Sequence, residues 1–142
     1  MEQRNFLKAQ MDQVGRALAR IITEFFGLVP DDELEPAIAK TNESLMRELN
    51  LDLDQLIRLN PSERKEYLAE RSLAPEHLTP LTNYMITLGE YYRPVDPPRA
   101  NQLFQCVLQL YEWTDESTNL YSLERFSQEE KIKQYLRPQG ER

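Results

Sequence analysis

The chain has 142 residues, a formal net charge of −7, 40% hydrophobic and 29% charged residues, a balance typical of a folded globular protein rather than a disordered one. Its acidic character argues against nucleic acid as a ligand, because negative charge repels a phosphate backbone. Charged residues interrupt every apolar run well before the roughly 18 residues that span a bilayer, and the first stretch is unlike a signal peptide. We therefore expect a cytoplasmic protein without stable membrane association.

Helix-forming residues dominate the composition. Glycine occupies only four positions, Leu, Glu, Gln, Arg and Ala are abundant, and no stretch alternates apolar and polar residues as a half-buried strand does. The sequence predicts an all-α chain folded as a single helical domain over residues 1–142. Within it we expect N-terminal helices over 1–50, helical hairpins over 51–137 and a frayed tail over 138–142.

The clearest periodicity covers residues 3–27. Six apolar residues recur at spacings of four and three, which places them on one face of a long amphipathic helix: Leu7, Met11, Val14, Leu18, Ile21 and Phe25. The basic residues beside them would also suit a helix on a membrane surface, but the acids among them favour packing. We expect the apolar face to pack internally, and the side carrying Gly15 and Ala19 to form a weak homodimer.

Capping signals predict the helices that follow. Asp31 or Asp32 after Pro30 can cap a second helix, and Asn60-Pro61-Ser62-Glu63 has an N-cap, a proline and an acid in the order of a helix start. Thr79-Pro80 and Asp96-Pro97 repeat that signal. The predicted helices cover residues 31–49, 52–59, 61–71, 79–92 and 97–113. Beyond them we expect a helix containing Leu120, Leu123 and Phe126, then a last helix that starts at the Ser127–Glu130 capping-box pattern and ends near Leu136.

The segment from Met85 to Tyr92 resembles the first helix of a tetratricopeptide repeat, although Met85 stands where that family favours Trp. The family places a Leu-Gly pair before a Tyr, and its second helix carries a small residue four positions before a bulky aromatic; the matching residues here are Leu88, Gly89, Tyr92, Ala100 and Phe104. The resemblance covers about residues 80–113. Flanking segments 51–72 and 116–137 have the size of such hairpins without the signature.

This resemblance implies a stack of antiparallel helical hairpins behind the long N-terminal helix, with a concave groove that binds a peptide or protein. It implies that Asn83, Ile86, Glu90 and Arg93 face the groove and that Tyr91 lies near its edge. The paired Lys and Asn residues of carboxylate-binding repeats are absent, so a C-terminal carboxylate is not the expected ligand. Trp113, like Tyr91, lies beside the apolar stripe near a helix end, where exposed aromatics are enriched at binding surfaces.

A second resemblance concerns the N-terminal stretch. Residues from Gln3 to Gly27 are similar to the start of small bacterial helical proteins to which no function is assigned, so this similarity implies no function.

No group of residues has the pattern of a catalytic, cofactor or metal site. His77 is the single histidine, so it has no second imidazole with which to bind a metal, and we expect a surface or capping role for it. Cys106 stands in a run without charge between Ala100 and Tyr111, which predicts a buried and inert thiol. The acids from Asp31 to Glu35 suit a helix start rather than a calcium loop.

The leading hypothesis is therefore a non-catalytic protein–protein interaction module, or adaptor, without a cofactor. The alternative is a small ligand-binding helical bundle or an enzyme of unknown substrate, which would require an enclosed pocket with convergent polar groups. A structural subunit that acts by self-association is a third reading.

Overall fold

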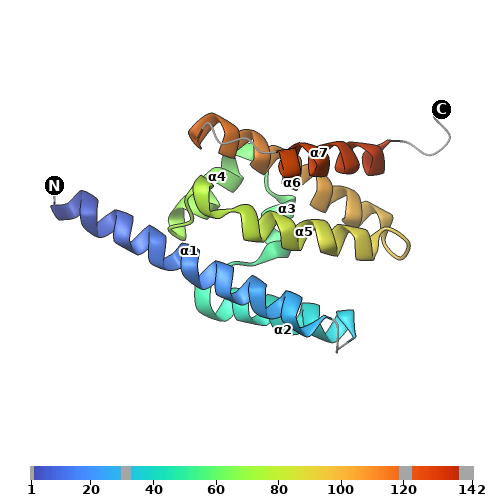
Figure 1. Cartoon of the computed structure of the whole chain (residues 1–142), viewed down its shortest axis with the longest axis horizontal. Coiled ribbons are helices and arrows are strands. Elements are labelled where there is room, and N and C mark those ends of the chain that lie inside the picture. The colour runs from blue at the N-terminus through green and yellow to red at the C-terminus, as the bar shows by residue number, and fades with distance from the viewer. Residues whose placement is uncertain (1, 30–32, 119–122, 138–142) are drawn as a thin grey trace. The chain divides into compact units, whose positions relative to one another are not determined.

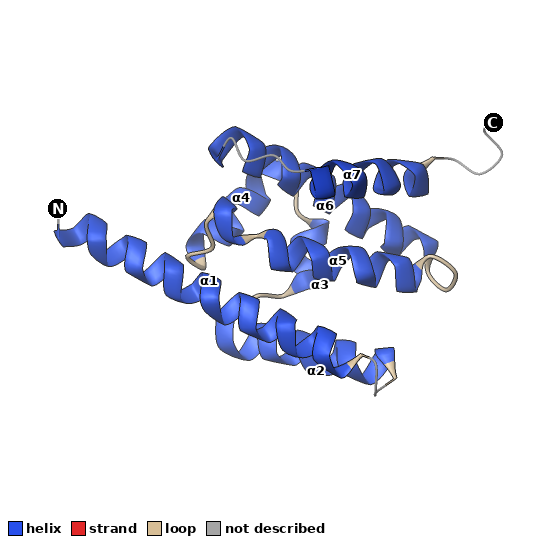
Figure 2. Cartoon of the chain, in the orientation of Figure 1, coloured by secondary structure: helices blue, strands red, loops and turns tan. Residues whose placement is uncertain are grey.

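The structure, a computed structural model, describes residues 2–29, 33–118 and 123–137. Regular structure within these residues is entirely helical, as the composition predicts (Figures 1 and 2). The elements in chain order are α1 (Glu2–Leu28), α2 (Leu34–Leu49), α3 (Leu53–Arg58), α4 (Pro61–Glu70), the short 3-10 helix η1 (Pro75–His77), α5 (Thr79–Tyr92), α6 (Pro97–Thr118) and α7 (Leu123–Leu136).

The chain divides into two compact units, Met1–Leu81 and Thr82–Arg142, and the boundary lies inside α5. The sequence-based boundary between N-terminal helices and hairpins, at residue 50, does not coincide with this division. The first unit contains α1 to α4 and η1, and the second contains most of α5 with α6 and α7.

The first unit is built on the packing of α1 against α2 (Figure 1). Both helices are amphipathic, and their apolar faces supply fully or nearly buried residues to this core: Leu18, Ile21, Ile22 and Phe25 from α1, and Ala37, Ile38, Leu45 and Leu49 from α2. Burial of these side chains is the main stabilising term of the pair.

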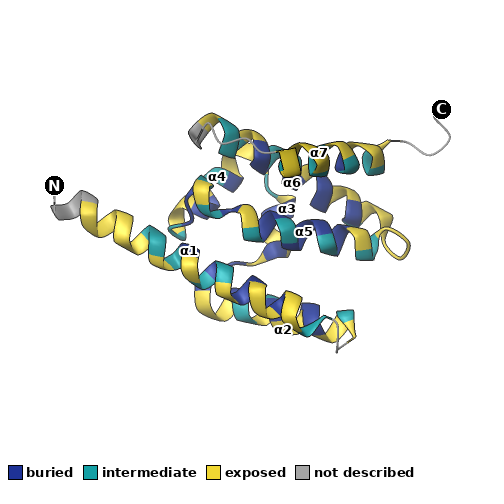
Figure 3. Ribbon diagram, in the orientation of Figure 1, coloured by how far each residue is buried: buried dark blue, intermediate teal, exposed yellow. Residues whose placement is uncertain are grey.

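The apolar seam of α1 is buried over only part of its length. None of residues 5–14 is buried, and the exposed fractions of Phe6 and Leu7 are 69% and 53%. The reason is length: α1 has 27 residues and α2 has 16, so the N-terminal part of α1 extends beyond its neighbour (Figure 3). The expectation that the whole seam from Leu7 onwards packs internally is therefore wrong for its first two turns.

Local hydrogen bonds turn the chain between α2 and α4. Asn50 adopts the left-handed conformation (φ 54°), and its amide donates to the Met46 carbonyl at 3.1 Å, which ends α2 as an αL motif. The Leu51 amide donates to the Leu45 carbonyl at 3.2 Å. Asp52 caps α3 by accepting from the Gln55 amide at 3.4 Å. Asn60 and Glu63 form the capping box that the sequence predicts.

Arginine side chains tie α4 to the preceding backbone. The buried Arg64 donates from Nε to the Leu56 carbonyl at 3.1 Å and from Nη2 to the Ile57 carbonyl at 2.9 Å. Both carbonyls belong to the last turn of α3, where intrahelical donors run out, and that of Leu56 also accepts from the Leu59 amide at 3.3 Å. The Arg71 guanidinium lies 3.4 Å from the centroid of the Tyr67 ring, and the Tyr67 hydroxyl accepts from the Asp52 amide at 2.8 Å.

In the second unit, α5 and α6 approach closely at Gly89. A Cβ at this position would lie 2.5 Å from Cε1 of Phe104, so a larger residue would push the helices apart. Ala100 and Cys106 are also buried on α6, which confirms the predicted environment of the thiol. Burial raises the pKa of the Tyr84 hydroxyl on α5 and of the Tyr111 hydroxyl on α6.

The end of the chain differs from the sequence-based prediction. α6 continues to Thr118, and α7 runs without a break from Leu123 to Leu136, so Ser127 lies inside a helix and does not start one. The capping-box pattern predicts a start only where the preceding residues are not helical, and here residues 123–126 already form the first turn. The predicted position of Leu120, like the predicted caps Asp31 and Asp32, lies outside the described residues.

Candidate functional site

Helix α5 is buried on most of its surface and leaves one narrow stripe accessible. Between Leu81 and Tyr91 the only residues not buried are Asn83, Thr87, Glu90 and Tyr91, which we call the α5 stripe. Their spacing places them on one side of the helix, over about 12 Å at 1.5 Å per residue. Three of them belong to the predicted partner-binding set.

Ile86, which the resemblance placed in a groove, is buried with 3% of its surface exposed. Its side chain therefore belongs to the core and not to an accessible surface. The helical period explains the difference, because position 86 lies beside the buried Thr82 and Gly89 as well as beside the stripe.

Helix α7 borders the C-terminal end of the stripe. The Tyr135 hydroxyl donates to Glu90 Oε2 at 2.7 Å, Lys131 Nζ lies 3.1 Å from the same oxygen, and the Arg93 guanidinium lies 4.0 Å from the centroid of the Tyr135 ring. Partial burial and the bond to the Glu90 carboxylate raise the pKa of Tyr135. Glu90 and Arg93 thus serve the attachment of α7.

The predicted aromatic rim is partly accessible. Tyr91 and Trp113 are both half-buried, and the Tyr91 ring meets the Tyr92 ring edge-on at a centroid distance of 5.0 Å. The stripe and Arg93 come from one helix and its following turn, whereas Trp113 comes from α6. Within the described residues, no ring contact or hydrogen bond joins Trp113 to the α5 stripe.

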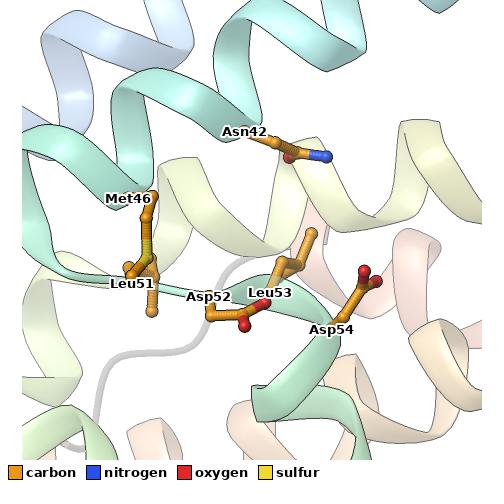
Figure 4. A pocket seen from close by; sticks show the side chains of 6 residues that line it. All are labelled: Asn42, Met46, Leu51, Asp52, Leu53 and Asp54. Atoms are coloured by element: carbon orange, nitrogen blue, oxygen red, sulfur yellow. The ribbon is translucent and has the colours of Figure 1, made fainter.

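The first unit contains a half-open hollow of about 280 Å³ between α2 and the start of α3 (Figure 4). Asn42 and Met46 project into it from α2, and Leu51, Asp52, Leu53 and Asp54 come from the segment that follows. We call this the α2–α3 hollow. The sequence did not indicate it, because it depends on how the turn at Asn50 folds the chain back beside α2.

His77 makes a tertiary contact that the sequence did not indicate. Its Nε2 lies 3.1 Å from Asp12 Oδ1 on α1, across 65 positions of sequence, and its ring covers Gly15, where a Cβ would lie 2.6 Å from His77 Cγ. The expected capping role is thus replaced by packing on α1. Gly15 is thus covered by the chain's own residue, while Ala19 on the same side keeps part of its surface accessible. The homodimer through the Gly15 and Ala19 side stays a prediction.

The described residues contain no cluster of three or more His, Cys, Asp or Glu side chains suited to a metal ion. No helix in this part of the chain has a stretch both long and apolar enough to cross a membrane. Comparison with protein-family models, with curated proteins and with solved structures finds no match to this chain.

Proposed function

We propose that this protein is a non-catalytic interaction module that binds a peptide or protein through the α5 stripe, with Tyr91 and Trp113 as aromatic anchors. In this proposal α5 and α6 form a tetratricopeptide-like hairpin within a stack that follows the long helix α1, and no cofactor takes part. The observation that supports it most is the α5 stripe itself, since a helix otherwise buried presents an amide, two oxygen-bearing side chains and an aromatic ring on one side.

The chemistry of the stripe favours recognition of polypeptide. The Asn83 amide makes no hydrogen bond to another described side chain or backbone group, so its carbonyl and NH₂ remain available to a peptide unit. Tyr91 offers an aromatic surface of the kind that dominates binding energy at protein interfaces. Glu90 is balanced by Lys131 at 3.1 Å, so hydrogen bonds and aromatic packing, rather than charge, would select the partner.

The alternative, a small-molecule site, has less support. Ligand pockets usually enclose roughly 300–1,000 Å³, whereas the α2–α3 hollow holds about 280 Å³ and is half open. A thermal-shift screen with metabolites tests this alternative, because a ligand of the folded state raises Tm. A consistent rise with one chemical class would favour it over the interaction module.

The direct test combines Asn83→Lys with Tyr91→Ala and leaves Glu90 and Arg93 intact, since those two hold α7. The matched control is Gln105→Lys, a change at an exposed position of α6. In affinity purification from the native cell followed by mass spectrometry, wild type and control should capture the same proteins and the stripe variant should lose them. Equal capture by all three, with unchanged circular dichroism, would remove the α5 stripe as the binding surface.

A further inference from the structure

The N-terminal end of α1 is an unpartnered apolar surface. In residues 5–14 no side chain is buried, Phe6 and Leu7 expose 69% and 53% of their surface, and the half-exposed Met11 and Val14 continue the same face. Two charged side chains lie in this segment, and Asp12 is engaged by His77 at 3.1 Å. Within residues 5–14 the apolar face is therefore flanked by one exposed cation, Lys8.

The α2–α3 hollow has an apolar wall and an acidic rim, which complement the apolar face and the cation of α1. Its wall includes the Met46 side chain, 50% exposed, and its rim carries the carboxylates of Asp52 and Asp54, both on exposed residues. Figure 4 shows Asn42 and Met46 on one side of this space and the two aspartates on the other. An apolar side chain next to a cation would find both an apolar contact and a counter-charge there.

We propose that the free end of α1 from one copy of the chain docks in the α2–α3 hollow of a second copy. Phe6 and Leu7 would pack against Met46, and Lys8 would pair with Asp54 at the rim. This assignment goes beyond the proposed function, because it involves neither α5 nor the partner-binding residues. It uses the N-terminal end of α1, a different part of this helix from the Gly15 and Ala19 side.

The occupant is a second copy because the apolar end of α1 and its cation match the apolar wall and the acidic rim of the hollow. Where a twofold axis relates the two copies, the contact forms twice, which closes the assembly and doubles the buried area. Each contact involves only a few side chains, so the area that the dimer buries lies at the small end of the range for specific interfaces. Association is therefore weak and dependent on concentration.

The experiment is a charge exchange followed by sedimentation velocity over a series from low to high micromolar concentration. Wild type is expected to move from a monomer of 16.8 kDa towards twice that mass. Lys8→Glu and Asp54→Lys should each raise the dissociation constant about tenfold, because each places like charges opposite one another. The double variant restores the opposite pairing and should return to within about threefold of wild type.

Matched charge reversals serve as controls. Lys133→Glu and Glu66→Lys change exposed residues outside both surfaces and should associate as wild type does. Asp54→Asn preserves the start of α3 better than Asp54→Lys, and it should weaken association about threefold even if the lysine variant fails to fold. Capture of partners by the α5 stripe should be the same in all of these variants.

Two results would overturn the proposal. One is a wild-type chain that remains monomeric at high micromolar concentration. The other is a folded double variant that associates no better than either single variant, because that outcome would deny that Lys8 and Asp54 meet.

Discussion

Gly15 lies against the ring of His77, and this contact leaves no room for a larger residue at position 15. We predict that Gly15→Ala destabilises the chain, although alanine is the better helix former by roughly 0.5–1 kcal/mol. The added Cβ would meet His77 Cγ at 2.6 Å, near the base of a side chain that is also held by Asp12. Overpacking of this kind costs about 1–3 kcal/mol, so the net loss should be about 1 kcal/mol in urea unfolding.

The same substitution made in a His77→Ala background provides the control. With the ring removed, Gly15→Ala should stabilise the chain by roughly 0.5–1 kcal/mol, the ordinary preference of a helix interior. The reversal of sign measures the coupling between positions 15 and 77 directly. A loss of equal size in both backgrounds would mean that the ring does not limit position 15.

Tyr84 gives a prediction at alkaline pH. Burial raises the pKa of its hydroxyl above the ordinary value, so the folded chain retains a proton that an unfolded tyrosine loses near pH 10. The contribution of the neutral hydroxyl to stability is complete below that pH and decreases as pH rises above it. The decline of Tm between pH 9 and 11 should therefore be shallower in Tyr84→Phe than in wild type. Parallel declines would show that other groups control alkaline unfolding.

Helix α7 is the least anchored helix of the second unit. Of its described residues only Ile132 is buried. Its other attachments include the bonds from Tyr135 and Lys131 to Glu90, those from Arg125 to Asp115 and the Tyr111 carbonyl, and the contact of the Tyr135 ring with Phe104. We predict that Ile132→Ala, which removes about 2–5 kcal/mol of packing at a buried isoleucine, releases α7 alone. Hydrogen exchange measured by mass spectrometry should then accelerate across residues 123–136.

The control in the same experiment is the protection of α1 and α2 from hydrogen exchange, because these helices belong to the other unit. Their protection should stay as in wild type, since local opening follows the least stable element. Acceleration spread evenly over the chain would contradict the prediction and would make α7 an integral part of the core.

Most helices could be predicted from the sequence because their signals are local. The periodic apolar face of α1 and the Asn60–Glu63 capping box act within one or two turns, and both appear where the sequence places them. The error at Ser127 has the same origin, because a capping pattern carries no information on whether the preceding residues are helical. A prediction from local signals is least secure where two helices follow each other closely, as α6 and α7 do.

On the scale of the whole molecule, what the sequence could not predict depends on contacts between distant positions. Asp12 and His77 lie 65 positions apart, and Glu90 and Tyr135 lie 45 apart, so no periodicity connects them. The resemblance places Glu90 and Arg93 in a groove, while in the structure both contact α7. Asn83, Tyr91 and Trp113 retain accessible surface, because nothing described in the chain covers them fully.

The accessible surfaces of the two units suggest two separate roles. The proposed partner surface involves α5 and α6, while the proposed self-association involves α1 and the α2–α3 hollow. Because the two sets share no residue, variants of one surface should leave the other function intact. This separation lets partner binding be measured under conditions where self-association is absent.

The measurement that tests the proposed function most directly is oxidative footprinting of aromatic side chains in the chain alone and in complex with a co-purifying protein. Hydroxyl radicals label accessible Tyr and Trp rings, so the experiment reports on Tyr91 and Trp113 themselves. Binding through the α5 stripe predicts that both lose most of their label in the complex, while labelling of the exposed Phe6 stays unchanged. Equal labelling of Tyr91 and Trp113 in the free and bound chain would contradict the proposal and move the binding surface elsewhere.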